Sequence, residues 1–187
     1  MEKKFDTLQK WRDDLNICIR CGYCFELCHL FRLFSWEADS PRGKLLLIYG
    51  LLSGDVESSL DIAEKIFQCF HCKNCEKSCS AKVPVTDIIK DAKTALIEIG
   101  YDVEGVASRV NEDLCSRCGL CVSVCKPEAL SFGENGKPPI VDKAKCEGCG
   151  VCAATCPSGA IYQEKGFGVS QSELLGKLIS SLEGVAQ

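Results

Sequence analysis

The sequence predicts an α+β protein with two small domains: an all-helical one over residues 1–104 and one with short strands over residues 105–168. A helix is expected over residues 169–187. Four cysteine runs share one spacing, and pairing them in order leaves 40 residues between the first two runs but only 20 between the last two. The longer insert has helical periodicity, whereas the shorter one contains β-rich segments bounded by turns. Neither part of a 187-residue chain divided in this way can bury a large core.

All sixteen cysteines belong to these runs, each of which reads C-x2-C-x2-C-x3-C. In chain order the cysteines are Cys18, Cys21, Cys24, Cys28; Cys69, Cys72, Cys75, Cys79; Cys115, Cys118, Cys121, Cys125; and Cys146, Cys149, Cys152, Cys156. A 4Fe-4S cube needs one thiolate for each iron, and a loop with two residues between cysteines wraps three sulfurs around one corner. The fourth cysteine, one residue further away, points elsewhere. We therefore predict that the sixteen cysteines ligate four 4Fe-4S clusters.

Disulfides and zinc are the alternatives for so many cysteines. Cysteine makes up about 9% of the chain, a level that indicates a disulfide scaffold in a short secreted protein. The first eleven residues lack the apolar stretch of a signal peptide, which favours a cytoplasmic location where thiols stay reduced. Zinc binds C-x2-C pairs well, yet zinc sites rarely need a third and a fourth cysteine at these further spacings. Both alternatives fit the repeated spacing less well than iron–sulfur clusters.

Three helices are expected between and after the first two cysteine runs. A Ser-Pro pair at residues 40–41 supplies the N-cap and first helical position of a helix that ends at Gly54. A second helix over residues 56–67 has apolar side chains at nearly 3.6-residue spacing. The third helix follows the second run and is capped by Thr86 or Asp87.

The second half of the chain has a different pattern. Strands are expected over residues 129–132, 139–142 and 160–163, with a turn over residues 133–136. Residues 170–173 read as a capping box that opens an amphipathic C-terminal helix. The apolar stripe of that helix is expected either to pack on its own domain or to dock a partner subunit.

Residues 107–166 resemble a two-cluster bacterial ferredoxin, including the proline that follows Cys156. The resemblance implies a β-α-β-β-α-β order of elements. It also implies that the fourth cysteine of each run ligates the cluster of the neighbouring run. In such an arrangement, Cys156 completes the site of the third run and Cys125 completes that of the fourth. The same exchange in the first pair assigns Cys79 to the first run and Cys28 to the second.

The first half resembles another family over residues 15–100. The matching features are Cys-Gly-Tyr-Cys at residues 21–24, Ser-Pro-Arg-Gly-Lys at residues 40–44 and the second cysteine run. They are similar to the helical ferredoxin domain of glycolate oxidase iron-sulfur subunits, and to the corresponding helical iron-sulfur subunit of heterodisulfide reductase. His29 and Ser80 stand where that family usually has a proline after each fourth cysteine. The chain also lacks the later cysteine-rich domains that bind disulfide substrate in heterodisulfide reductase.

A glycine follows the second cysteine in three of the four runs: Gly22, Gly119 and Gly150. We predict that these glycines are cofactor-binding, because a missing Cβ lets backbone amides approach the cube and permits positive φ. The second run has Lys73 at this position, with Lys77 nearby. Positive charge favours the reduced cube, so we expect a higher potential here than at the fourth run's site. The alternative is that both lysines point to solvent and have little effect.

Other kinds of activity have little support. His29 and His71 are expected to be structural, since every cluster already has four cysteines, and we predict no catalytic residues. The chain has 22 basic and 26 acidic side chains and no basic tract, so nucleic-acid binding is not expected. The longest apolar run, residues 45–52, is too short to span a membrane.

These features together predict an electron-transfer subunit with four clusters in series. Its expected partners are a catalytic oxidoreductase subunit and a further redox partner such as a flavoprotein or a ferredoxin. The architecture resembles the small iron-sulfur subunit of tungsten-dependent class II benzoyl-CoA reductase, which implies anaerobic metabolism and a tungstopterin partner protein. Two alternatives are the iron-sulfur subunit of a heterodisulfide-reductase-like or glycolate-oxidase-like flavoprotein complex, and an iron-sulfur redox sensor.

Overall fold

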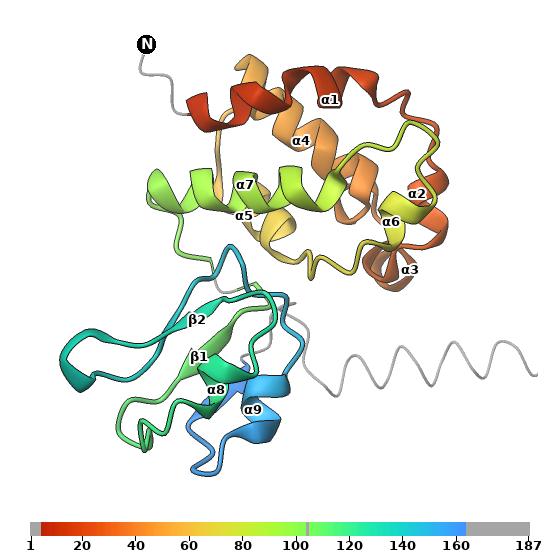
Figure 1. Ribbon diagram of the computed structural model, residues 1–187. Helices are drawn as coiled ribbons and strands as arrows, with labels where there is room; N and C mark the ends of the chain where they lie inside the picture. Colours follow the sequence, from red (N-terminus) through yellow and green to blue (C-terminus); the bar gives the residue numbers. More distant parts are fainter. Residues whose placement is uncertain (1–4, 104, 164–187) are drawn as a thin grey trace, which may run out of the picture.

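The computed structural model describes residues 5–103 and 105–163, which form a helical part and a smaller part that contains the strands (Figure 1). This mixture of helices and small sheets is compatible with the predicted α+β class. The helical part consists of η1 (Asp6–Trp11), α1 (Arg12–Ile17), α2 (Tyr23–Glu26), α3 (His29–Phe34), η2 (Glu37–Asp39), α4 (Pro41–Ser53), α5 (Leu60–Phe67), α6 (Asn74–Lys77) and α7 (Val85–Glu98).

Helix α7 is the centre of the helical part. It packs against η1, α4, α5 and α6. Its buried face carries Ile88, Ile89, Ala92 and Leu96, which repeat at helical spacing and join one continuous apolar core. The long helices α4 and α5 contribute Ile48 and Ile66 to the same core. Burial of this stripe, more than intrinsic helix propensity, is what stabilises so small a helical unit.

Helix α4 begins and ends as predicted. The Ser40 hydroxyl accepts a hydrogen bond from the Gly43 amide at 2.9 Å, Pro41 occupies the first turn, and Gly54 ends the helix with φ +80°. The next helix is shorter than predicted. It begins at Leu60 rather than Val56, because the Ser59 hydroxyl caps it.

The predicted cap of α7 is wrong. Neither Thr86 nor Asp87 precedes the helix, which begins at Val85 after Pro84. The Glu76 carboxylate instead accepts hydrogen bonds from the Thr86 amide at 2.8 Å and the Thr86 hydroxyl at 2.7 Å. A side chain of the second cysteine run therefore caps the helix that follows it.

The part that contains the strands begins after residue 104. Its elements are β1 (Ser108–Val110), α8 (Leu120–Ser123), β2 (Leu130–Ser131), η3 (Glu134–Gly136), β3 (Ile140–Val141), α9 (Val151–Thr155) and β4 (Ile161–Gln163). Strand β1 pairs antiparallel with β4, placing Arg109 opposite Tyr162, and β2 pairs antiparallel with β3. All three strands expected from the sequence are present with shorter bounds, and residues 134–136 of the expected turn form η3. The two small cores of this part are built around Cys121, Cys152 and Cys146.

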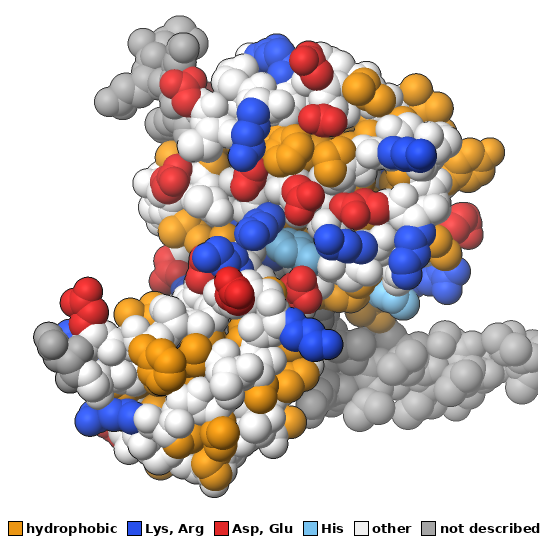
Figure 2. All heavy atoms as spheres, viewed as in Figure 1, with side chains coloured by type: hydrophobic (Ala, Val, Ile, Leu, Met, Phe, Trp, Pro, Cys, Tyr) orange, Lys and Arg blue, Asp and Glu red, His pale blue; other side chains and the backbone are white. Residues whose placement is uncertain are grey.

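The two parts meet through the segment that follows α7. Gly105 has φ +54°, and a Cβ built on it would lie 2.7 Å from the carbonyl oxygen of Phe67, at the end of α5. A Cβ on Gly148 would lie equally close to the carbonyl oxygen of Val106. Lys143 pairs with Asp102 across the same region. Figure 2 shows basic and acidic side chains gathered along this junction.

The predicted C-terminal helix over residues 169–187 lies outside the described residues. Among the helices of residues 5–103 and 105–163, none is both long and apolar enough to cross a membrane.

Candidate metal centres

Two cavities in the helical part are each lined by four cysteines, three from one run and one from the other. One cavity is lined by Cys18, Cys21, Cys24 and Cys79. The other is lined by Cys69, Cys72, Cys75 and Cys28. We name these the first and second cavities. Their linings match the exchange of fourth cysteines expected from the sequence.

The short helices α2 and α6 produce this exchange. Cys24 lies in α2 and Cys75 lies in α6, and the two helices pack against each other (Figure 1). Each helix is only one turn long, so the chain leaves it within three or four residues of the third cysteine. The fourth cysteine of each run, Cys28 or Cys79, is thereby carried to the cavity of the neighbouring run.

All four runs share one backbone conformation around their second cysteine. The residues immediately before and after it have positive φ, between 52° and 87°: Arg20 and Gly22, His71 and Lys73, Arg117 and Gly119, and Gly148 and Gly150. Successive amides in such a turn form a concave N–H surface that binds anions. Gly22, Gly119 and Gly150 thus have the positive φ expected of them, and Lys73 has it as well.

The sequence did not reveal the other half of this pattern. Arg20, His71 and Arg117 are not glycines, although each adopts a left-handed conformation. Lys73 has φ 60° at the position of the other runs' glycines. Such a conformation costs a residue with a Cβ roughly 1–2 kcal/mol, so the surrounding loop must hold it in place.

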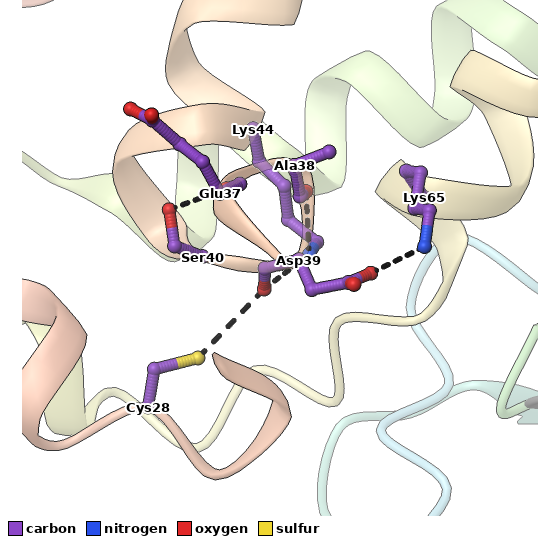
Figure 3. Close-up of polar contacts among 7 residues, drawn as sticks. All are labelled: Cys28, Glu37, Ala38, Asp39, Ser40, Lys44 and Lys65. Carbon is purple, nitrogen blue, oxygen red and sulfur yellow. Dashed lines mark hydrogen bonds and ion pairs between the residues drawn. The ribbon is translucent and has the colours of Figure 1, made fainter. Parts of the chain in front are cut away.

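Backbone amides also approach two of the fourth cysteines. The Val83 amide donates a hydrogen bond to Cys79 Sγ at 3.4 Å, and the Ala129 amide donates to Cys125 Sγ at 3.3 Å. Cys28 differs, since helix α3 begins directly after it and its Sγ lies 3.9 Å from the Asp39 carbonyl oxygen (Figure 3). Amide donors such as those of Val83 and Ala129 favour the thiolate form of cysteine, which is the form that binds iron.

Two buried lysines lie close to the second cavity. Lys44 lines it with a side chain that is 1% exposed, and its Nζ donates to the carbonyl oxygens of Asp39 at 2.7 Å and Ala38 at 3.3 Å (Figure 3). The Asp39 carboxylate forms an ion pair with Lys65 at 2.7 Å. Burial lowers the pKa of Lys44, while the charges of Cys69, Asp39 and Cys28 oppose this lowering.

Lys93 is the second buried lysine and is 0% exposed. Its Nζ donates to the Cys69 carbonyl oxygen at 2.6 Å and lies 5.7 Å from the centre of the Phe67 ring. Burial lowers the pKa of Lys93 to about 8, and the negative charges of Cys69, Cys146 and Glu147 act in the opposite direction. With this pKa the side chain is mostly protonated at pH 7, and a buried ammonium beside a cysteine run favours a negatively charged ligand there.

The second cysteine run was predicted to be cationic because of Lys73 and Lys77, but the buried positive charges near it come from other lysines. Lys73 and Lys77 are exposed, which agrees with the alternative that they point to solvent. The buried charges are Lys44 and Lys93, which lie 25 and 24 residues from Cys69. The sequence contained one sign that Lys93 is buried, because Lys93 falls on the same helical face as the apolar residues Ile89 and Leu96.

Both histidines line the second cavity. Burial and the neighbouring charges of Lys93, Lys90 and Lys73 lower the pKa of His71 to about 3, so its imidazole is neutral at pH 7. Its Nε2 is buried and has no hydrogen-bond partner among the described residues. An unpartnered ring nitrogen at the wall of a cysteine-lined cavity fits an N–H donor toward a sulfur-rich ligand. The His29 Nε2 lies 3.2 Å from the Asn74 amide nitrogen.

In the part that contains the strands, the third cysteine of each run is buried. Burial raises the pKa of Cys121 and of Cys152, whose Sγ lies 3.4 Å from the Ser108 hydroxyl. Cys156 is the opposite case, since a hydrogen bond with Ser158 lowers its pKa to about 7. Cys125 packs against both small cores, one of which contains Cys146 and the other Cys121 and Cys152.

The donor set fits iron–sulfur clusters. Among the described residues, no three or more His, Cys, Asp or Glu side chains converge tightly enough to hold a single metal ion. A cube spreads its four sulfur ligands over four irons, so the relevant observation is a cavity with four cysteines on its walls. The first and second cavities meet that description, with left-handed turns beside each and buried lysines beside the second.

Comparisons with known proteins give the same assignment. Residues 17–84 and residues 114–160 match two families, each described as a 4Fe-4S dicluster domain. The chain is 33% identical over 103 residues to the glycolate oxidase iron-sulfur subunit of Escherichia coli, and 29% identical over 81 residues to a probable glycolate oxidase iron-sulfur subunit of Bacillus subtilis. These alignments cover 55% and 43% of the chain. They cover only 23% and 18% of the relatives, so the chain corresponds to about a fifth of each one's length.

Two segments of the chain therefore match 4Fe-4S dicluster domains, and about half of the chain is similar to part of glycolate oxidase iron-sulfur subunits.

Proposed function

We propose that this chain is an electron-transfer subunit in which four 4Fe-4S clusters relay electrons to or from a catalytic oxidoreductase subunit. The observation that carries the proposal is the lining of the first and second cavities, each by three cysteines of one run and one of the other. The proposed ligand sets of the third and fourth runs follow the same exchange, with Cys156 and Cys125 as the crossing ligands. When bound, the clusters supply one-electron redox chemistry.

The residues of the chain hold the clusters and balance their charge. A cube with four thiolates carries a net negative charge, which a small interior tolerates only if donors or cations compensate it. The left-handed turns around each second cysteine, the amides of Val83 and Ala129, and the buried Lys44 and Lys93 are proposed to do this. Four sites in series suit electron transfer over a distance, because tunnelling rates fall steeply with separation.

The relatives support a subunit of a larger oxidoreductase. Both are iron-sulfur subunits of glycolate oxidase by name, so we propose that this chain also acts beside a catalytic subunit, together with a further redox partner such as a flavoprotein or a ferredoxin. The tungstopterin partner rests on the resemblance of the whole architecture to class II benzoyl-CoA reductase. Neither the family matches nor these relatives involve a tungsten protein, so that partner remains a prediction.

Anaerobic co-purification of the native complex tests this function. Mass spectrometry would identify the partner, and iron, flavin and tungsten would be measured in the same sample. We expect stoichiometric iron–sulfur clusters and an oxidoreductase partner whose reduced cofactor reduces the clusters. Tungsten would support the benzoyl-CoA reductase relationship, and flavin a glycolate-oxidase-like complex. A chain that holds its clusters but exchanges no electrons with the partner would contradict the relay.

A further inference from the structure

The structure carries one inference about the order of the relay, and it rests on the proposed function. A chain of contacts leads from the second cavity to the fourth cysteine run. It starts at Lys93, whose Nζ donates to the Cys69 carbonyl oxygen at 2.6 Å and lies 5.7 Å from the centre of the Phe67 ring. Lys93 is fully buried and Cys69 lines the second cavity, so this cation is close to the second cavity and shielded from solvent.

The next contacts cross the junction. The Phe67 carbonyl oxygen and Cβ lie against Gly105, where an added Cβ would be 2.7 and 2.9 Å from them. Val106, the following residue, lies equally close to Gly148. Gly148 is in the turn between the first two cysteines of the fourth run, and the β3–α9 connection that contains it faces the helical part (Figure 1). The contacts of Lys93 with Cys69 and Phe67, and those that lead on through Gly105 and Val106 to Gly148, therefore join the second cavity to the fourth cysteine run.

We infer that Lys93 is a positioning residue that links the second-run and fourth-run sites, and that these two sites form the middle pair of the relay. The site of Cys18, Cys21, Cys24 and Cys79 is then at one end, and the site of Cys115, Cys118, Cys121 and Cys156 is at the other. A reduced cube is more negative than an oxidised one, so two neighbouring cubes repel an added electron. A buried ammonium between them reduces that repulsion and raises both potentials.

The test is the Lys93→Met variant, which keeps an unbranched side chain and removes the charge. Potentials of the individual clusters are measured by redox titration followed by EPR. We expect the potentials of the second-run and fourth-run sites to fall, the second-run site by at least 59 mV, equivalent to a tenfold change in its ratio of reduced to oxidised cluster. The two end sites should change little. The control is Lys77→Met, which removes an exposed charge from the second run and should shift all four potentials little.

A second measurement keeps the inference testable if Lys93→Met does not fold. In a Cys118→Ala background the third-run site is removed, and the fourth-run site is then expected to couple magnetically with the second-run site alone. Adding Cys72→Ala should narrow the EPR signal of the fourth-run site in the fully reduced protein, whereas adding Cys21→Ala should not. The opposite pattern would make the first-run site the neighbour and overturn the order.

Four clusters with unaltered potentials in Lys93→Met would overturn the role of Lys93, whereas missing clusters in the unmodified chain would contradict the proposed function instead.

Discussion

Replacing Cys79 by alanine tests the exchange of ligands between runs. Cys79 belongs by sequence to the second run but lines the first cavity with Cys18, Cys21 and Cys24. With four cubes per chain, the substitution should reduce the number of intact 4Fe-4S clusters from about four to about three, and iron by as much as about four atoms of sixteen. The damaged site should be that of the first run, although Cys79 lies more than 50 residues from Cys24 in the sequence.

Double substitutions identify the damaged site without spectroscopic assignment. If Cys79 and Cys21 serve the same cluster, Cys79→Ala combined with Cys21→Ala should still leave about three intact cubes, because the second change strikes a site already lost. Cys79→Ala combined with Cys72→Ala should leave about two. The assay is a spin count of the fully reduced protein by EPR, together with iron and acid-labile sulfide determination under anaerobic conditions. The reverse pattern would show that each run closes on itself and would refute the reasoning.

Three further predictions concern the cysteine runs. Lys73→Gly relieves a left-handed conformation at φ 60° and should stabilise the protein by about 1 kcal/mol in anaerobic thermal unfolding, while Lys73→Ala retains the strain; equal stability of the two variants would argue against this. Glu76→Ala removes the carboxylate oxygen that accepts both hydrogen bonds from Thr86 and should cost about 1–2 kcal/mol in the same assay, and no loss would mean that α7 does not depend on this cap. Cys156→Ala should remove the third-run cluster and spare the fourth-run cluster. Iron determination on the double variant Cys156→Ala/Cys118→Ala checks this: a loss of about one cube supports the exchange of ligands, and a loss of about two contradicts it.

Several features could be predicted from the sequence because they depend on local chemistry. The cysteine spacing predicted the clusters, the resemblance to two-cluster ferredoxins implied the exchange of fourth ligands, and the lining of the first and second cavities agrees with that exchange. Ser40, Pro41 and Gly54 define α4 because caps act within one turn.

The features that the sequence did not reveal depend on contacts between distant residues. The cap of α7 comes from Glu76, ten residues before Thr86, so local capping rules could not locate it. Lys44 and Lys93 approach the second cavity only because α4 and α7 pack together. A lysine on the apolar face of a predicted helix was nevertheless a visible sign of a buried charge with a specific partner.

Native mass spectrometry of the anaerobically prepared chain is the most direct test of the central claim. The account predicts a single dominant species whose mass exceeds that of the polypeptide by four 4Fe-4S units, about sixteen irons in all. A dominant species with zinc, with disulfides in place of metal, or with only two clusters would contradict a relay of four sites.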